Sequence, residues 1–362
     1  MFTQRQAQHS KTRELKNMVD LTVRLPFHDS VAARWRSAGW AMELMQYRPA
    51  GFNERWPEFT QHFSQLNADL QWTLLQTWYS LYPGQDILSL QQLLPFAKTE
   101  KIKALLLVHL KAAGMDSGNV PFAESDPFYA SPYYQAFEQW SLQKPSSITL
   151  DALMQNPLLP GQSLIVSVQY RNRDKPGFLL IRDSVGNWIK NKRQQIARYP
   201  QLARSVTNLP YFLTNGNTPQ GLYKIVGLAS STNAWIGPTT NLQLVMPYET
   251  GNTGMFFTDT THARSQYAAL LGPYATLPGL WESFTAGQLG RSEIIAHGTA
   301  IPAVYYKNEP YYPLTPSLGC LCSPEQYKRS GNIKKSIQQQ WIDRLQELPS
   351  LPSYLLVVEI KD

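Results

Sequence analysis

A cysteine-containing turn near the C-terminus is the part of this sequence whose residue types favour covalent chemistry. Cys320 follows Gly319 in the tetrapeptide Ser317-Leu318-Gly319-Cys320, and Cys322 comes two positions later. Glycine permits a sharp turn that presents the thiol beside backbone N–H groups, and those of Gly319 and Cys320 could hold an oxyanion. A thiol attacks well only as a thiolate, so the turn predicts a nucleophile that needs a basic partner.

The basic partner is predicted from the six histidines. Four of them lie in the part of the chain that is expected to be helical: His9, His28, His62 and His109. His297 closes an expected strand and is followed by Gly298, which makes it the better candidate, with His262 second. A thiolate–imidazolium pair would let acylation persist below the unperturbed thiol pKa of about 8.5.

The same residues could in principle form two other kinds of site, a zinc site or a disulfide. Cys320, Cys322 and His297 would give zinc three ligands without a fourth, so no metal site is predicted. A disulfide between Cys320 and Cys322 would be strained, and we expect both thiols to be free.

Composition and length describe a globular chain of about two domains. Of the 362 residues, 43% are hydrophobic and 16% are charged, which is enough to build a core. The longest apolar run, Ala104–Val108, is too short to span a bilayer, so no transmembrane segment is predicted. The two cysteines exclude a disulfide framework.

The formal net charge of +7 is concentrated in the second half of the chain. Residues 171–204 are rich in Lys and Arg, opposed only by Asp174 and Asp183. Such a stretch attracts carboxylate-rich or polyanionic ligands, unless it is simply a solvated basic face. No zinc-finger, helix-turn-helix or base-stacking pattern accompanies it, so nucleic acid is not an expected partner.

Hydrophobic spacing divides the chain near residue 150. Apolar residues three and four apart predict helices within residues 10–145, in stripes at 28–47, 59–75, 89–113 and 134–142, with a polar connector at 114–132. We expect residues 1–150 to form a helical domain that binds substrate or a partner, and residues 151–362 to form a mostly β domain.

The second half shows short β-branched runs punctuated by Gly and Pro. Strands are expected at 164–170, 177–183, 221–228, 242–245, 254–257, 293–297 and 354–360. A helix is expected at 333–348, and shorter ones at 264–271 and 281–287. The last two belong to a stretch near 258–292 that we interpret as an insertion, either a lid over a site or a surface loop.

Three segments of the second half resemble the catalytic domain of L,D-transpeptidases, the YkuD-like family of bacterial cell-wall enzymes. His297-Gly298-Thr299, a spacer and Ser317-Leu318-Gly319-Cys320 match the family's histidine–cysteine pattern. The segment from Thr218 to Ile225 is similar to its TPxGxYxI strand, and Met246-Pro247-Tyr248 is similar to a stretch found upstream of the histidine. The resemblance covers about residues 160–362.

The resemblance implies an α+β chain, with an N-terminal α-helical domain followed by a mostly β YkuD-like domain carrying a helical insertion. It implies that Cys320 attacks the carbonyl between an L-centre and a D-residue of a peptidoglycan stem, with His297 as base. The Gly298 carbonyl would orient the imidazole, Ser317 would support the turn, and the N–H groups of Gly319 and Cys320 would hold the oxyanion. D-Alanine leaves, and an amine of a second stem resolves the acyl-enzyme into a cross-link.

Substrate contacts are expected from five residues: Tyr248, Arg291, Thr299, Tyr305 and Cys322. The sequence has Leu318 where members carry a second histidine and Cys322 where they carry Arg or Asn, and Arg291 could replace the latter. Two alternatives stay open: an L,D-carboxypeptidase or hydrolase of stem-peptide or protein–peptidoglycan bonds, and a non-catalytic wall-binding module.

The implied partners and location follow from the same resemblance. Donor and acceptor stem peptides would be the substrates, carbapenems would be inhibitors, and no cofactor is required. A cell-wall protein could bind the helical domain. The reaction belongs to cell-wall biogenesis and cell shape, so we expect a periplasmic or envelope location and an export signal that has been removed.

Overall fold

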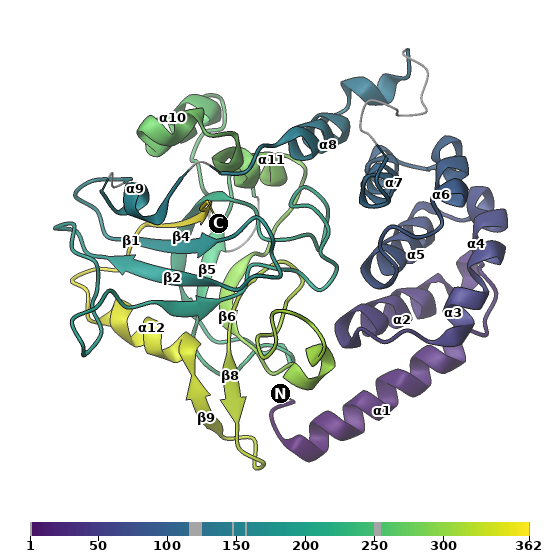
Figure 1. Ribbon diagram of the computed structural model, residues 1–362, viewed down its shortest axis with the longest axis horizontal. Coiled ribbons are helices and arrows are strands. Elements are labelled where there is room, and N and C mark those ends of the chain that lie inside the picture. The colour runs from purple at the N-terminus through teal and green to yellow at the C-terminus, as the bar shows by residue number, and fades with distance from the viewer. Residues whose placement is uncertain (1, 116–124, 147, 156–157, 250–254, 362) are drawn as a thin grey trace. The chain divides into compact units, whose positions relative to one another are not determined.

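The computed structural model describes residues 2–115, 125–146, 148–155, 158–249 and 255–361. The chain forms two compact units, a helical one and one built on a β-sheet (Figure 1). The sheet unit consists of residues 1–7, 143–205 and 216–362, and the helical unit consists of residues 8–142 and 206–215. The chain thus differs from the expected simple division at residue 150, because each unit takes in a short segment from the other part of the chain.

The helical unit is built from the first eight α-helices of the chain. They are α1 (Arg5–Thr22), α2 (Ala32–Met45), α3 (Ala50–Glu54), α4 (Trp56–His62), α5 (Ala68–Leu81), α6 (Ile87–Leu93), α7 (Glu100–Ala112) and α8 (Pro132–Leu142). The stripe expected at 59–75 is two helices. Asn67 breaks it, because its side chain accepts a hydrogen bond from the Leu70 N–H and begins α5 as an N-cap.

Aromatic side chains fill the core of this unit. Trp35 is fully buried, and Trp56 stacks on Trp78 with ring centroids 3.8 Å apart. The segment 206–215 adds the buried side chains of Leu209 and Phe212, and Phe212 contacts the ring of Trp140. Burial of these apolar groups explains why the segment belongs to the helical unit.

The sheet unit contains ten strands and four α-helices among the described residues. The strands are β1 (Leu164–Gln169), β2 (Gly177–Arg182), β3 (Tyr199–Gln201), β4 (Gly221–Ala229), β5 (Asn241–Val245), β6 (Ile295–Gly298), β7 (Leu321–Ser323), β8 (Glu325–Tyr327), β9 (Ile333–Ser336) and β10 (Tyr354–Glu359). The helices are α9 (Leu150–Gln155), α10 (Ala263–Leu271), α11 (Glu282–Gln288) and α12 (Ile337–Gln346).

Eight of the strands form one mixed sheet in the order β3-β2-β1-β10-β4-β5-β6-β7, and β8 pairs with β9. The sheet is nearly closed, because Leu202, just after β3, exchanges two backbone hydrogen bonds of 2.8 and 2.9 Å with Cys322 of β7. The chain is therefore α+β. The hairpin expected around residues 173–177 is present as the antiparallel pair β1–β2.

Helix α12 lies against β6 and β7, and α10 and α11 pack near β4. The Trp341 Nε1–H of α12 donates to Ser323 Oγ at 3.2 Å, and Gln338 donates to the Ala296 carbonyl oxygen at 3.0 Å. Because side chains alternate along a strand, His297 and Cys322, the neighbours of Ala296 and Ser323, point to the face away from α12.

Helices α10 and α11 of the insertion 258–292 contribute side chains to the core. Tyr267 of α10 is fully buried and its hydroxyl accepts the Leu222 N–H of β4 at 2.8 Å. Phe284 of α11 is buried in the same apolar cluster. The interpretation of the segment as a surface loop is therefore wrong for these two helices, whereas its interpretation as a lid stays a prediction.

The structure corrects one strand prediction and one helix prediction. No strand forms at 255–257, where Phe256 and Phe257 instead bury their rings against one another, while Gly254 lies outside the described residues. In the range 333–348, which was expected to be one helix, the first four residues form strand β9 instead. Helix α12 follows, and Ser336 caps it by accepting the Gln339 N–H.

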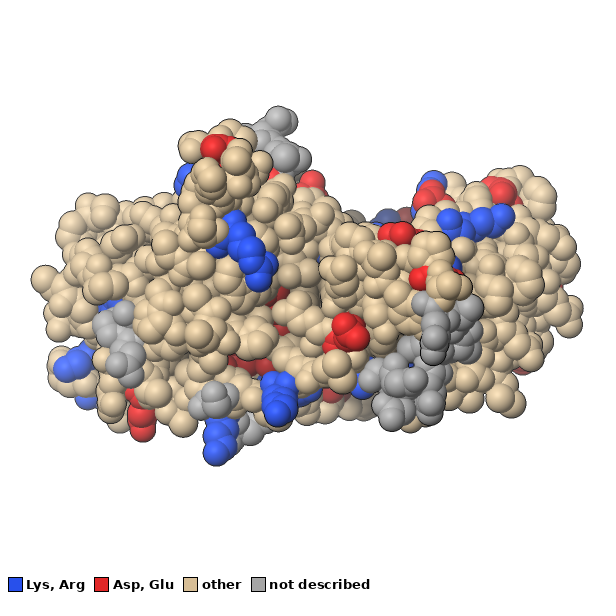
Figure 2. Space-filling model, turned by 90° about the horizontal axis from the view of Figure 1, so that it is seen from above, with Lys and Arg blue, Asp and Glu red and all other residues tan. Residues whose placement is uncertain are grey.

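The basic stretch 171–204 does not form one continuous charged face. Arg173 is buried in an ion pair with Glu359 at 2.8 Å, and Arg182 is buried and donates to backbone carbonyls. The stretch keeps six exposed cations: Arg171, Lys175, Lys190, Lys192, Arg193 and Arg198. On the face shown in Figure 2, Lys and Arg occur in small groups among uncharged residues and interspersed Asp and Glu. Within the described ranges, no helix is both long and apolar enough to cross a membrane.

Candidate active site

The parallel pairing of β6 and β7 brings the predicted base and nucleophile to one sheet edge. His297 lies opposite Cys322 in this register, and Ala296 lies opposite Leu321. Cys320 precedes β7, so it lies beside Ile295 and diagonally across from His297. Ideal strand spacing and rise correspond to about 8 Å between the Cα atoms of His297 and Cys320. Among the described residues no hydrogen bond joins the two side chains, because the His297 Nδ1 faces the Gly298 carbonyl oxygen and the Cys320 Sγ faces the Glu293 carbonyl oxygen.

The imidazole of His297 is held in one tautomer. The residue is 4% exposed, and its Nδ1 lies 2.6 Å from the Gly298 carbonyl oxygen, which can only accept a hydrogen bond. The neutral ring therefore carries its proton on Nδ1 and keeps the lone pair on Nε2. The expected contact between His297 and the Gly298 carbonyl is present, and it leaves Nε2 as the atom able to take a proton.

The sulfur of Cys320 lies against the segment that leads into β6. Cys320 is partly exposed, and its Sγ is 3.5 Å from the Glu293 carbonyl oxygen. A backbone hydrogen bond from Ile295 also reaches the thiol. These contacts fix the sulfur at the start of the strand that carries His297.

Ser317 organises the turn before Cys320. Its Oγ accepts the Gly319 N–H at 3.1 Å and donates to the Cys320 carbonyl oxygen at 2.8 Å. Gly319 has φ +121°, a conformation that L side chains rarely adopt. The Gly319 N–H is thus already used inside the turn, which corrects its expected role in an oxyanion hole and leaves the Cys320 N–H as the candidate donor.

The turn rests on Thr218 and Arg291. Thr218 Oγ1 donates to the Gly319 carbonyl oxygen at 2.8 Å, which joins the Thr218–Ile225 segment to the nucleophile turn. Arg291 is buried and donates to the backbone carbonyl oxygens of Gly216 and Asn217 at 3.0 and 2.9 Å. A Cβ at position 319 would meet the Gly216 carbonyl oxygen as well as the Arg291 guanidinium, and the backbone there has a positive φ, so glycine is required.

Glu249 joins the third motif to the same place. Its carboxylate accepts the Met246 N–H at 3.0 Å and the Glu293 N–H at 2.7 Å. All three segments that carry the family resemblance therefore converge on the surroundings of Cys320.

Burial controls the protonation of the two central groups. Desolvation raises the pKa of the Cys320 thiol to about 11, against the smaller opposing effects of the Ile295 hydrogen bond and the Arg291 charge. Desolvation also lowers the pKa of His297, with the Gly298 hydrogen bond acting in the other direction. Both shifts disfavour charge, so they favour a neutral thiol and a neutral imidazole over an ion pair.

Most of the five residues that were expected to contact substrate make contacts within the protein instead. Cys322 and Thr299 are 2% and 3% exposed and hydrogen-bond each other through their side chains. Arg291 is directed at backbone carbonyls. Tyr248 packs edge-on against Phe284 at 5.0 Å, and Tyr305 is half-buried beside Tyr306. Leu318 is 42% exposed and lies two positions from the nucleophile.

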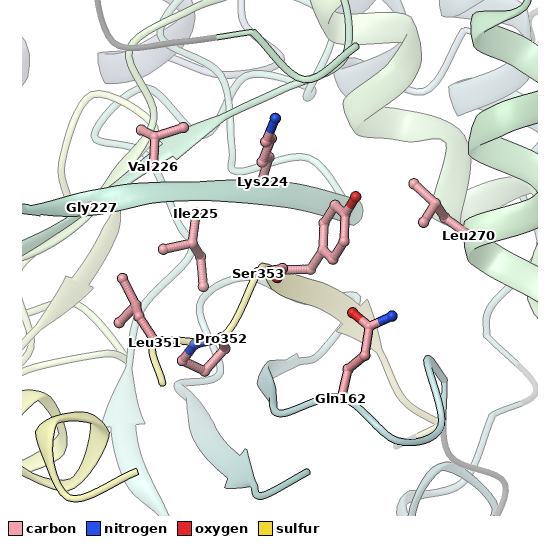
Figure 3. A pocket seen from close by; sticks show the side chains of 10 residues that line it. Gln162, Lys224, Ile225, Val226, Gly227, Leu270, Leu351, Pro352 and Ser353 are labelled. Carbon is pink, nitrogen blue, oxygen red and sulfur yellow. The ribbon is translucent and has the colours of Figure 1, made fainter. Parts of the chain in front are cut away.

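A pocket beside the sheet lies away from the predicted site residues. The pocket, of about 500 Å³, lies where β4 passes the start of β10, with the side chain of Gln162 on its wall (Figure 3). Its lining includes Lys224, Gly227 and Leu351 but none of the predicted site residues. Over the described ranges, no group of three or more His, Cys, Asp or Glu side chains is placed to hold a metal ion.

No family model matches the chain, and neither a curated protein nor a solved structure matches it significantly.

Two supporting residues were not predicted as part of the site. Thr218 lies in a motif that the sequence singled out, but its contact with Gly319 depends on strand placement. Glu249 directly follows Met246-Pro247-Tyr248, and only the fold shows that its carboxylate binds Glu293. In the sequence, the one signal for Glu249 was an acidic residue placed directly after a motif.

Proposed function

We propose that this protein is a cysteine acyltransferase of the L,D-transpeptidase type that cross-links peptidoglycan stem peptides. The observation that supports the proposal is the parallel pairing of β6 and β7, in which His297 lies opposite Cys322 and the Cys320 turn leads directly into β7. The YkuD-like domain architecture is part of the proposal, supported by the convergence of the three motif segments on Cys320.

The reaction begins from the neutral pair. His297 Nε2 takes the Cys320 proton as the sulfur attacks the carbonyl carbon that joins an L-centre to D-alanine. The Cys320 N–H stabilises the oxyanion, and the buried Arg291 cation stabilises negative charge on the sulfur. The C–N bond then breaks, and His297 returns its proton to the departing D-alanine amine, leaving a thioester.

The second half-reaction uses the same groups in reverse. An amine of the acceptor stem attacks the thioester carbonyl and gives its proton to His297. The C–S bond breaks, the new amide is the cross-link, and the thiol is restored by the proton from His297. Water in place of the amine would give hydrolysis, the chemistry of an L,D-carboxypeptidase.

The substrate class agrees with the charge of the sheet unit. Stem peptides carry carboxylates, and the exposed cations of the 171–204 stretch favour such ligands. This function requires a periplasmic or envelope location, which belongs to the proposal.

Incubation with a disaccharide-tetrapeptide, followed by mass analysis of the products, tests the function. A cross-linked dimer that Cys320→Ala abolishes is the expected product. Tripeptide without dimer would replace the transferase by a hydrolase. Unchanged substrate together with retained binding to sacculi would contradict the enzyme and favour a wall-binding module.

A further inference from the structure

Glu325 of β8 lies at the centre of a group of hydroxyls that no part of the proposed reaction uses. Its Oε1 accepts hydrogen bonds from Thr239 Oγ1 at 2.6 Å and Ser336 Oγ at 2.7 Å. Its Oε2 lies 2.5 Å from the Tyr327 hydroxyl. The carboxylate thus joins the segment before β5, the start of α12 and β8 itself.

The same carboxylate fills the space beside two glycines. A Cβ on either Gly237 or Gly298 would overlap the Glu325 carboxyl group, so a larger residue at either position would have to displace that side chain. The Gly237 N–H donates to the Gly298 carbonyl oxygen at 2.9 Å. Glu325 therefore packs against both residues of this backbone hydrogen bond.

The Gly298 carbonyl oxygen is also the acceptor that orients His297, at 2.6 Å from Nδ1. The residue that follows is held from the same side, because the Tyr327 hydroxyl lies 3.0 Å from the Thr299 carbonyl oxygen. The Tyr327 proton has two acceptors, Thr299 and Glu325, and either bond fixes the ring beside this segment.

We infer that Glu325 is a positioning residue for His297: it holds the Gly237–Gly298 backbone so that the Gly298 carbonyl keeps the imidazole proton on Nδ1 and Nε2 free. Glu325 acts through the backbone and through Tyr327. Its role in catalysis rests on the proposed function, whereas its effect on the imidazole does not.

The tautomer of His297 gives a direct readout. With ¹⁵N-labelled histidine, the six histidines give few ring signals, and His297→Gln assigns the one of interest. We expect the Nδ1–H tautomer in the wild type and a mixture with Nε2–H in Glu325→Ala. Glu325→Gln keeps an oxygen for Thr239 and Ser336 and should stay close to the wild type. Glu347→Ala, which removes an exposed carboxylate on the same unit, is the matched control.

A second readout is the rate at which a carbapenem acylates Cys320 as a function of pH. We expect Glu325→Ala to lower the rate at pH 7 by roughly tenfold, as loss of an orienting partner commonly does, with much smaller loss in Glu325→Gln. If Glu325→Ala does not fold, Tyr327→Phe, which removes the contact to Thr299, replaces it and should show the same change in tautomer.

Folded Glu325→Ala and Tyr327→Phe proteins with a wild-type tautomer and pH profile would overturn the inference. The failure of the proposed function looks different. A wild type that makes no cross-link and accepts no carbapenem, but whose His297 tautomer responds to Glu325→Ala, would leave the positioning role intact and remove the transpeptidase.

Discussion

The protonation of His297 and Cys320 decides how the thiol is activated. A neutral pair needs the imidazole as general base at the moment of attack, because desolvation holds the thiol pKa near 11 and the imidazole pKa below its ordinary value. We therefore expect the thiol to be unreactive toward reagents that require a preformed thiolate and, in the proposed function, to react with an acyl donor placed beside His297.

The pH profile of carbapenem acylation tests this mechanism. We expect the rate to rise as His297 loses its proton, at a pH below about 6.5, and then to stay level through neutral pH. His297→Gln should remove the level region and leave a rate that rises toward pH 11 with thiol ionisation. Alkylation by iodoacetamide, which needs the thiolate, should be slow at pH 7 in both proteins. Rapid alkylation of the wild type at pH 7 would instead indicate an ion pair.

At the scale of elements, the helical unit contains a carboxylate that its packing disfavours. Glu43 on α2 is 2% exposed and accepts hydrogen bonds from Gln76 and Thr77 of α5, with no cation among the partners described. Desolvation raises its pKa to about 7, against the smaller effect of these two bonds. The α2–α5 contact is tight here, because a Cβ on Gly39 would meet Thr77.

Glu43→Gln should therefore stabilise the protein at alkaline pH. A carboxyl group whose pKa is raised by folding contributes stability below pH 4.5, and that contribution is lost as pH rises through about 7. This pKa shift lowers the free energy of unfolding by roughly 3 kcal/mol at pH 8. The amide of Gln does not ionise and therefore removes that loss. Urea unfolding of both proteins at pH 5 and pH 8 measures it. Burial also lowers the pKa of His109 to about 4. Both proteins contain this histidine, so its effect cancels from the difference between their free energies of unfolding. An equal difference at the two pH values would contradict the assignment.

Periodicity predicted most of the apolar strands, but it missed four short strands, and no expected stripe covers α1 (Arg5–Thr22), the longest helix among the described residues. Strands β1, β2, β4 and β10 were predicted because each is a run of apolar residues bounded by turn residues. Strands β7, β8 and β9 have three or four residues each, too few for a pattern to appear. Their positions depend on partners distant in sequence, such as β6 for β7.

The same limit applies to the single residues of the candidate site. His297 and Cys320 could be named from residue type and motif, because a thiol, an imidazole and glycines carry their chemistry locally. The role of Arg291 could not, since only the fold reveals that its guanidinium binds the Gly216 and Asn217 carbonyls. The neutral state of the central pair depends on burial, which no local pattern specifies.

For the whole molecule, the interleaved chain is the feature with the clearest consequence. Residues 206–215 leave the sheet unit, belong to the helical unit and return, and residues 1–7 belong to the sheet unit. Leu209, Phe212 and Leu213 of this segment are 1% exposed or less. Neither unit is a continuous stretch of chain, so neither can be cut out at one point.

A fragment of residues 143–362 should therefore be less soluble than the full chain. It lacks the helical unit that buries the 206–215 segment and would expose its apolar side chains. We expect binding of a hydrophobic dye and concentration-dependent association, measured by light scattering. The same fragment with 206–215 replaced by a Gly/Ser linker should bind less dye. Equal dye binding by the two fragments would contradict this account.

Acceptance of the acyl group by the sulfur of Cys320, with His297 as base, is the step on which the proposed function depends. Its most direct test is intact-mass and peptide mapping after incubation with a carbapenem at pH 7. We predict one adduct on Cys320 in the wild type and in Cys322→Ala, none in Cys320→Ala, and strongly slowed formation in His297→Gln. An adduct that maps to Cys322, or one that forms at the wild-type rate without His297, would contradict the claim.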